Sequence, residues 1–211
     1  MFSVASVCAL WLALAWQTDI PLTTAKDFYR QGMSLIRARK YEDALTFFTR
    51  AVVMQPDYPD AYYGRGLACL ALRLYPKASA EFSKAIELKA DYSEAYSGRG
   101  RACLYINLGP NERCLPDLDQ ALKLNPKYTD GYVARALFHN KKGDLQRARA
   151  DLDQAVKLQP RNAEALFARG SILFRIGNKS AAIADLRRVA EIGDRAWAAR
   201  AKQTLQQLDA Q

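Results

Sequence analysis

A 34-residue internal repeat governs most of this 211-residue chain. When the chain is set against itself at that offset, residues of one kind return at the same positions in five successive units. A small-residue position holds Gly32, Gly66, Gly100, Ala136 and Gly170. A large apolar position holds Phe48, Phe82, Leu118, Leu152 and Leu186. A repeat of this length predicts a solenoid, in which each unit buries its apolar face only against its neighbours.

Each unit has the pattern of two helices. The first helix begins with an acidic residue, such as Asp60, and carries an apolar stripe. We expect this helix to end near a position held by Arg39, Arg73, Gly109, Gly143 and Gly177, where the three glycines can adopt the left-handed conformation. The second helix should stop before a position that holds proline in three units, because proline cannot continue a helix. These prolines are Pro56, Pro126 and Pro160.

The repeat also sets the domain organisation. Units are expected at 25–58, 59–92, 93–128, 129–162 and 163–193, and the third is stretched in the turn at 107–110. Asp194 is a candidate N-cap for one more helix, expected within 194–211. Its apolar face would carry Trp197, Ala201, Leu205 and Leu208. We expect this helix to cap the exposed end of the stack, and a Trp-bearing helix that docks a partner is the alternative.

The N-terminal segment, residues 1–18, differs from the rest of the chain. Residues 2–16 carry no charge, and a stretch of 15 residues is too short to span a bilayer by itself. With a small-x-small motif at 13–15, the segment resembles an export signal. No Lys or Arg precedes the apolar stretch, so a retained membrane anchor and a cytoplasmic protein stay open as alternatives.

The chain has none of the motifs that usually mark catalysis or cofactor binding. A Gly-rich phosphate loop, a CxxC motif and a nucleophile elbow are all missing, and His139 is the single histidine. His139 shares its repeat position with Leu35 and Leu173, which predicts a packing role. We therefore expect no enzyme activity, no cofactor and no metal. Cys103 and Cys114 fall on facing helices and could pair if the protein is exported, a question the sequence leaves open.

The repeated positions resemble those of the tetratricopeptide repeat family. The shared pattern is an aromatic residue, Gly–x₂–large apolar, Ala–x₃–Phe/Leu–x₂–Ala and a closing proline, over about residues 25–193. The resemblance implies an all-α, right-handed superhelical solenoid of five helix pairs with a C-terminal capping helix. It also implies a non-enzymatic scaffold that binds proteins or peptides. The pentatricopeptide RNA-binding family has a similar period, but these columns favour the tetratricopeptide pattern.

The resemblance places a concave groove on the first helices, between the packing positions. The matching residues are Tyr29, Met33, Tyr63, Leu67, Leu70, Arg101, Tyr105, Val133, Leu137, Asn140, Phe167, Ser171 and Phe174. Family members that hold acidic chaperone tails use a Lys/Asn/Arg clamp. The corresponding positions here are Tyr29, Met33, Gly64, Glu94 and Gly98, so we do not expect chaperone-tail binding. We expect an extended or helical segment with apolar anchors in this groove. Basic flanks would match an acidic edge at Asp60, Glu94, Asp130 and Glu164, with stabilisation of helix starts as the favoured alternative for these first-turn acids.

A second repeated set predicts ion pairs inside the stack. Four units carry an arginine just before the small-residue position and an acid on the second helix, whereas the first unit has Gln31 and Phe47. Residues that are present and absent together are expected to touch. The predicted pairs are Arg65–Glu81, Arg99–Asp117, Arg135–Asp151 and Arg169–Asp185. We interpret them as a structural ladder that fixes helix register, with a charged-ligand site as the alternative.

The net charge of +9 permits an acidic partner but does not identify one. Nucleic-acid binding would require basic residues interleaved with exposed aromatics along one surface, and no such run occurs. An RNA-binding helical repeat is therefore the weakest alternative. A structural subunit or spacer of a membrane-associated complex, attached through residues 1–18, stays open. Neither the partner nor the oligomeric state follows from the sequence.

Overall fold

The computed structural model describes residues 24–106, 112–192 and 194–209, and within these ranges the regular structure is entirely helical. The helix pairs are α2 (Ala25–Arg37) with α3 (Tyr41–Met54), α4 (Pro59–Ala71) with α5 (Tyr75–Leu88), α6 (Ser93–Ile106) with α7 (Leu115–Leu124), α8 (Thr129–Lys141) with α9 (Leu145–Leu158), and α10 (Ala163–Arg175) with α11 (Lys179–Ile192). A final helix, α12 (Arg195–Asp209), follows. The predicted all-α solenoid is confirmed, whereas the predicted leader and the stretched turn at 107–110 lie outside the described residues.

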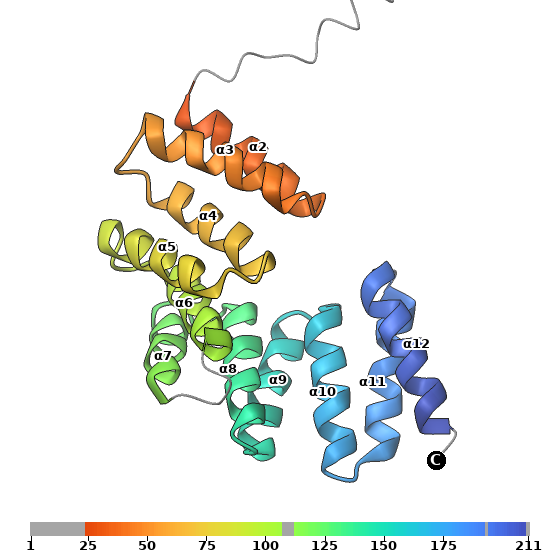
Figure 1. The fold of residues 1–211 in the computed structure, drawn as a ribbon. Helices are drawn as coiled ribbons and strands as arrows, with labels where there is room; N and C mark the ends of the chain where they lie inside the picture. Colours follow the sequence, from red (N-terminus) through yellow and green to blue (C-terminus); the bar gives the residue numbers. More distant parts are fainter. Residues whose placement is uncertain (1–23, 107–111, 193, 210–211) are drawn as a thin grey trace, which may run out of the picture.

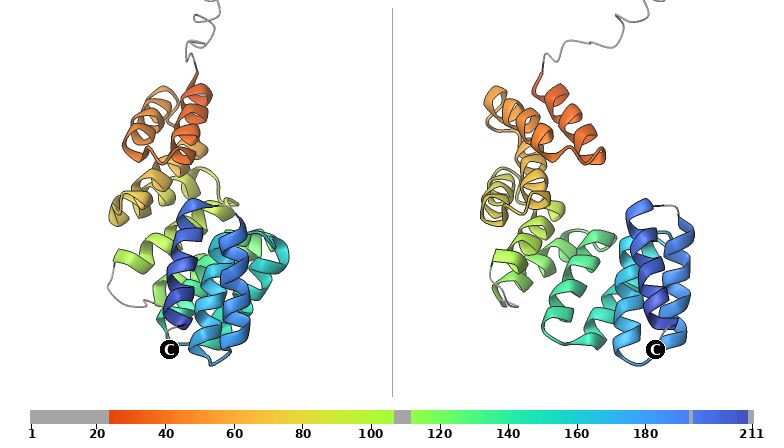
Figure 2. Two further views of the ribbon diagram at one scale, coloured as in Figure 1. Left: turned by 90° about the vertical axis from the view of Figure 1, so that its right-hand side faces the viewer. Right: turned by 45° about the vertical axis from the view of Figure 1, so that its right-hand side comes forward.

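The pairs pack one on the next and wind into a curved stack (Figure 1). The right-hand view of Figure 2 shows this curvature as an arch, with α2 near one end and α12 at the other. Each second helix contacts the first helix of the following unit, so the core runs the length of the stack as a chain of local clusters. This arrangement leaves the first helices free to form the inner face of the arch.

The turns inside the units use the left-handed backbone conformation at four described positions. Gly143 and Gly177 have φ of 81° and 87°, as the sequence predicts for glycine. Arg39 and Arg73 adopt the same conformation, with φ of 59° and 60°. A Cβ atom makes this region unfavourable, so the first two units contain a local backbone cost that the last two avoid.

Replacing Arg73 by Gly is expected to raise the free energy of unfolding by about 0.5–1 kcal/mol, because the left-handed cost exceeds the extra freedom of glycine in the unfolded chain. Gly143→Ala is the matched control, and its free energy of unfolding should fall by a similar amount. No heavy atom lies within 4 Å of a Cβ added at Gly143, so that loss reports the backbone alone. Urea unfolding of both variants measures the two effects, and a less stable Arg73→Gly protein would contradict the account.

The small and large repeat positions fit together across the unit boundary. The Phe82 ring is fully buried between Gly66 of its own unit and Gly98 of the next. A Cβ atom added at Gly66 or Gly98 would lie 2.7 or 2.6 Å from Phe82 Cε1. Where the large residue is Leu152, alanines take the place of both glycines, at Ala136 and Ala168 in the same cluster. At Leu152 the smaller central side chain thus leaves room for two flanking methyl groups.

Gly98→Ala is therefore expected to destabilise the fold by about 2 kcal/mol through overpacking against Phe82. Adding Phe82→Leu should make the loss smaller than the sum of the two single changes by about 1 kcal/mol, because the smaller side chain makes room for the methyl group. A double-mutant cycle by chemical denaturation measures this coupling. If the two losses in free energy of unfolding were strictly additive, the Phe82 ring would not need a glycine at position 98.

The third unit and the C-terminal helix depart from the regular repeat. The short 3₁₀ helix η1 (Glu112–Cys114) precedes α7, which has 10 residues where the other second helices have 14. At the C-terminus, the Asp194 carboxylate accepts hydrogen bonds from the backbone N–H groups of Ala196 and Trp197, which starts α12. Ala201 and Leu208 are buried against the last units, so α12 covers their apolar face. In the part of the chain that the structure describes, no helix is both long and apolar enough to span a membrane.

Candidate partner-binding groove

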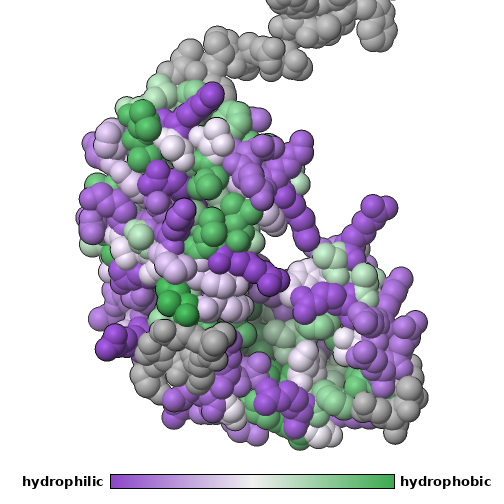
Figure 3. Space-filling view, in the orientation of Figure 1, coloured by the Kyte–Doolittle hydropathy of each residue, from purple (hydrophilic) through white to green (hydrophobic). Residues whose placement is uncertain are grey.

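A pocket of about 340 Å³ lies on the inner face of the arch, where α6, α8, α10 and α12 meet. Its lining is Arg101, Tyr105, Val133, Ala134, Ala136, Leu137, Asn140, Leu152, Glu164, Phe167, Ala168, Ser171, Ile172, Arg175, Trp197 and Arg200. Figure 3 shows a hollow on this side of the molecule, with green hydrophobic residues on its floor and purple hydrophilic residues around it. The volume falls in the range of small-ligand and side-chain pockets.

An apolar floor is formed by side chains from three helices. Val133 and Leu137 come from successive turns of α8, and Phe167 comes from α10. The Trp197 ring of α12 lies 5.3 Å from the Phe167 ring, centroid to centroid. These aromatic side chains are only partly buried, so the floor keeps apolar surface in contact with solvent.

The rim of the pocket is mainly cationic. Arg101 pairs with Glu164 at 3.6 Å, and Arg175 donates a hydrogen bond to the Asn140 side chain. The Arg200 guanidinium lies over the rings of Phe167 and Trp197, 4.9 and 4.8 Å from their centroids. The rim therefore carries three arginines against one glutamate.

A second pocket, of about 570 Å³, extends the groove toward the N-terminus. It shares Arg101 and Tyr105 with the first pocket and adds Leu67 and Leu70 from α4. The two pockets form one concave surface from the second unit to the capping helix, which we call the groove.

Some of the predicted groove residues line at least one of the two pockets, and the others line neither. Seven line the first pocket, namely Arg101, Tyr105, Val133, Leu137, Asn140, Phe167 and Ser171. Leu67 and Leu70 line the second pocket. Phe174 is exposed at 37% but lines neither pocket. Tyr29, Met33 and Tyr63 are half-buried and line neither.

Tyr63, a predicted groove residue, packs among neighbouring aromatic rings and lines neither pocket. Its ring packs against Phe82 and Tyr92, with centroids 5.9 and 5.1 Å away. Tyr29 packs in the same way, 5.9 Å from Phe48 and 5.6 Å from Tyr58. Each ring touches one from the loop that leads into the next unit. Tyr58, Tyr92 and Tyr128 stand at one repeat position, so the sequence did carry a signal for this contact between units.

These tyrosines lie near two residues of the predicted acidic edge, Asp60 and Glu94. The Tyr92 hydroxyl donates a hydrogen bond of 2.7 Å to Asp60. Burial raises the pKa of Tyr29 to about 12, and it also raises the pKa of Tyr63 and Tyr92. The phenols therefore stay protonated at neutral pH. Asp60 and Glu94, which accepts a hydrogen bond from Ser93, already have partners within the chain.

Sequence reasoning missed the two side chains that α12 contributes to the pocket. Trp197 was expected on the capping face, with partner docking as the alternative, and Arg200 received no role. Both come from outside the 34-residue repeat, so no column of equivalent residues marks them. The sequence did offer one signal for them. Trp197 and Arg200 are three residues apart on a helix, which places them on one face.

The predicted ladder residues are in contact in all four units. Arg99, Arg135 and Arg169 each make two hydrogen bonds to their aspartates, with lengths from 2.7 to 3.0 Å. Arg65 pairs with Glu81 at 2.7 Å. In the first unit the Phe28 and Phe47 rings lie 6.1 Å apart, so an aromatic contact replaces the ion pair there.

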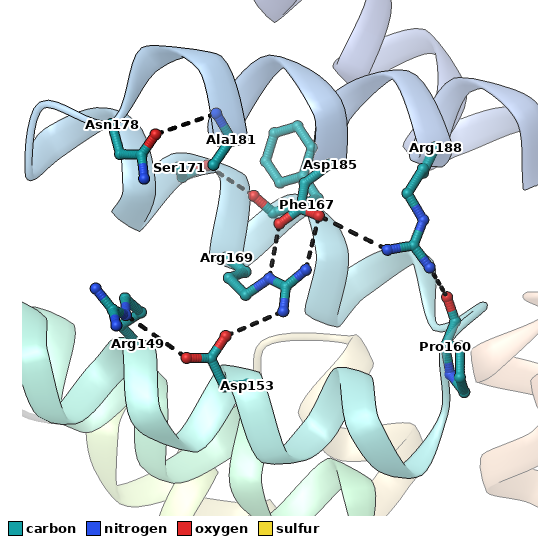
Figure 4. Close-up of polar contacts among 10 residues, drawn as sticks. All are labelled: Arg149, Asp153, Pro160, Phe167, Arg169, Ser171, Asn178, Ala181, Asp185 and Arg188. Carbon is teal, nitrogen blue, oxygen red and sulfur yellow. Dashed lines mark hydrogen bonds and ion pairs between the residues drawn. The ribbon is translucent and has the colours of Figure 1, made fainter.

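Three of the arginines also bridge two units. The third contact of Arg169 is to Asp153 of the preceding second helix, at 3.0 Å (Figure 4). Arg135 reaches Asp119 in the same way, at 2.8 Å, and Arg99 reaches the Ser83 hydroxyl at 3.1 Å. The guanidinium thus joins the two helices of its own unit to the unit before it. This geometry supports a role in fixing register, because every contact is within the stack.

His139 lies beside the Arg135 rung and is buried. Its Nε2 atom is 3.8 Å from Asp151, and burial lowers the pKa of the imidazole. The ring is therefore neutral at neutral pH and packs against Phe138 at a centroid distance of 5.5 Å. Among the described residues, no three His, Cys, Asp or Glu side chains gather closely enough to hold a metal ion.

The structure pairs Cys103 with Cys114. The two sulfurs are bonded and the Cα atoms are 5.5 Å apart, a usual separation for a disulfide. The bridge joins α6 to the residue that precedes α7, across the stretched connection of the third unit. Cys69 is a free, buried cysteine.

Comparison with known structures gives the same architecture at low sequence identity. TTC0263, a TPR protein of Thermus thermophilus, has a TM-score of 0.79 and 23% identity over 86% of this chain and 99% of that one. PilW, a type IV pilus biogenesis factor, has a TM-score of 0.67 and 19% identity over 86% and 92% of the two chains. YrrB, a TPR protein with an unusual peptide-binding site, has a TM-score of 0.53 and 23% identity over 85% and 92%. At these identities the likeness shows the fold.

Sequence comparison identifies the family. No curated protein matches the chain. The family model for the tetratricopeptide repeat matches residues 29–93 and 133–200, which together are more than half of the chain. The fold is that of a scaffold for protein–protein interaction. The chain belongs to the tetratricopeptide repeat family.

Proposed function

We propose that the groove binds a segment of a partner protein through apolar anchor side chains. The observation that carries this proposal is the partly exposed floor formed by Leu137, Phe167 and Trp197, over a pocket large enough for a side chain. Apolar surface gathered in a concavity usually marks an interaction site. The similar protein YrrB is described as having a peptide-binding site, which agrees with this use of the fold.

The expected affinity is modest. Each buried anchor contributes about 1.5–3 kcal/mol before the cost of ordering the segment. Two or three anchors therefore give roughly micromolar dissociation constants. Such a complex exchanges readily, as befits an adaptor.

The test removes floor side chains without touching the ladder. Tyr105→Ala/Phe167→Ala truncates one residue shared by both pockets and one from the floor of the first. We expect at least tenfold weaker partner binding, equivalent to about 1.4 kcal/mol, with helicity retained by circular dichroism. Val53→Ala/Met54→Ala is the matched control, because both residues are exposed on α3 outside the groove. Equal loss in the control, or undiminished binding by the groove variant, would move the binding surface elsewhere.

We also propose that the protein is exported through residues 1–18. Two features support this: the uncharged segment at residues 2–16 and the Cys103–Cys114 disulfide, since disulfides persist mainly in oxidising compartments. Mature protein that begins near Trp16 is the expected result of N-terminal sequencing. A soluble cytoplasmic species with Met1 intact would contradict export, and a membrane-bound species with Met1 intact would indicate an anchor.

A further inference from the structure

The arginines of the rim differ in how fully their charge is matched. Arg101 already pairs with Glu164. Arg175 contacts the neutral side chain of Asn140, and Arg200 contacts the rings of Phe167 and Trp197. Within the described ranges, neither Arg175 nor Arg200 has a carboxylate partner, and both are exposed. The ladder arginines, by contrast, hold one or two carboxylates each.

The two unmatched arginines lie at opposite ends of the apolar floor. Arg200 covers Phe167, near the start of α10. Arg175 is the last residue of α10, eight positions after Phe167 and hence about 12 Å further along the helix axis. This separation favours one carboxylate for each guanidinium group, and the small polar side chains Asn140 and Ser171 and the apolar floor line the pocket around them.

We propose that the segment bound in this groove carries two acidic side chains, one on each side of its apolar anchors. This inference rests on the proposed function and specifies the class of partner. In an extended segment, which rises about 3.3 Å per residue, acids some four residues apart would meet Arg200 and Arg175 together. A terminal carboxylate would satisfy one arginine only, so acidic side chains within a partner chain fit better. The basic flanks predicted from the sequence fit this pocket less well, because the acid in its lining, Glu164, already pairs with Arg101.

The experiment compares three pools of synthetic, C-terminally amidated peptides. Each peptide has a core of two to four residues, randomised among Leu, Ile, Met and Phe. One flanking residue stands on each side of the core, and both are Asp in the first pool, Asn in the second and Lys in the third. Immobilised full-length protein is incubated with equal amounts of the pools, and the retained peptides are quantified by mass spectrometry. Amidation removes the terminal carboxylate, so any preference must come from the flanking side chains.

We expect about tenfold greater retention of the Asp pool than of the Asn pool, and the least retention of the Lys pool. The preference should shrink as salt is raised, since exposed charges are screened. Arg175→Ala/Arg200→Ala should abolish it, whereas Arg161→Ala/Arg195→Ala, which removes two exposed arginines outside the groove, should keep it. Arg175→Glu/Arg200→Glu should prefer the Lys pool.

Two outcomes separate this inference from the proposed function. Equal retention of all three pools, lost in Tyr105→Ala/Phe167→Ala, would overturn the acidic assignment and leave the groove in place. Retention of no pool would overturn both. An Asp preference that survives Arg175→Ala/Arg200→Ala would also overturn the assignment, because other cations would then be responsible.

Discussion

Replacing Arg135 by Met is expected to lower the free energy of unfolding by about 3 kcal/mol. The guanidinium makes two hydrogen bonds to Asp151 and a third to Asp119 across the unit boundary. Only 8% of the Asp151 side chain is exposed, so loss of the cation leaves a carboxylate with little access to water. Thermal unfolding followed by circular dichroism should show a midpoint lower by about 6–12 °C.

Two further variants show whether burial causes the effect. Arg149 and Asp153 form an exposed pair along α9, both side chains being 45% exposed, so Arg149→Met should cost less than about 0.5 kcal/mol. Arg135→Met/Asp151→Leu should recover most of the loss, because no charge is then left unpaired. An unchanged midpoint for Arg135→Met, or a double variant as unstable as the single one, would contradict the structural reading of the ladder.

Loss of the Cys103–Cys114 disulfide is expected to lower the free energy of unfolding by about 2.7 kcal/mol. The bridge closes a loop with a sequence separation of 11, and this figure is the loop entropy it removes from the unfolded chain, at about 25 °C. Cys103→Ala/Cys114→Ala should therefore unfold about 5–10 °C below the oxidised protein. Alanine is preferred to serine because Cys114 is fully buried.

Reductant provides the control for this second prediction. Dithiothreitol should lower the midpoint of the unmodified protein toward that of the double variant and should not affect the variant itself. Thiol alkylation of the denatured, unreduced protein should leave Cys103 and Cys114 unlabelled. Labelling of both residues would show that they do not pair.

Repeated features of the structure were predictable because each one is sampled several times in the sequence. The helix pairs follow from the columns of small and large residues, and the Arg–acid contacts follow from their joint absence in the first unit, where Gln31 and Phe47 stand. The bridging contacts to Ser83, Asp119 and Asp153 were not predicted. These residues share one repeat position, but one is a serine and two are aspartates, so the position does not look conserved in charge.

The groove was only partly predictable, because it depends on how units meet. Leu137 and Phe167, which the sequence assigns to the inner face, line the first pocket. Tyr63 lines neither pocket, because the loop before the following unit brings Tyr92 against it. Trp197 and Arg200 belong to α12, which follows no repeat, and their place over the pocket emerges only from the packing of α12 on α10.

The most direct test of groove binding is site-specific photo-crosslinking. A benzoylphenylalanine residue placed at Leu137, on the pocket floor, is compared with one at Val53, which is 75% exposed on α3. After irradiation of cells that produce the protein, the Leu137 position should give a discrete covalent adduct with a partner chain. That adduct should disappear in the Tyr105→Ala/Phe167→Ala background. Adducts from Val53 but none from Leu137 would contradict the account and place the partner on the outer face of the arch.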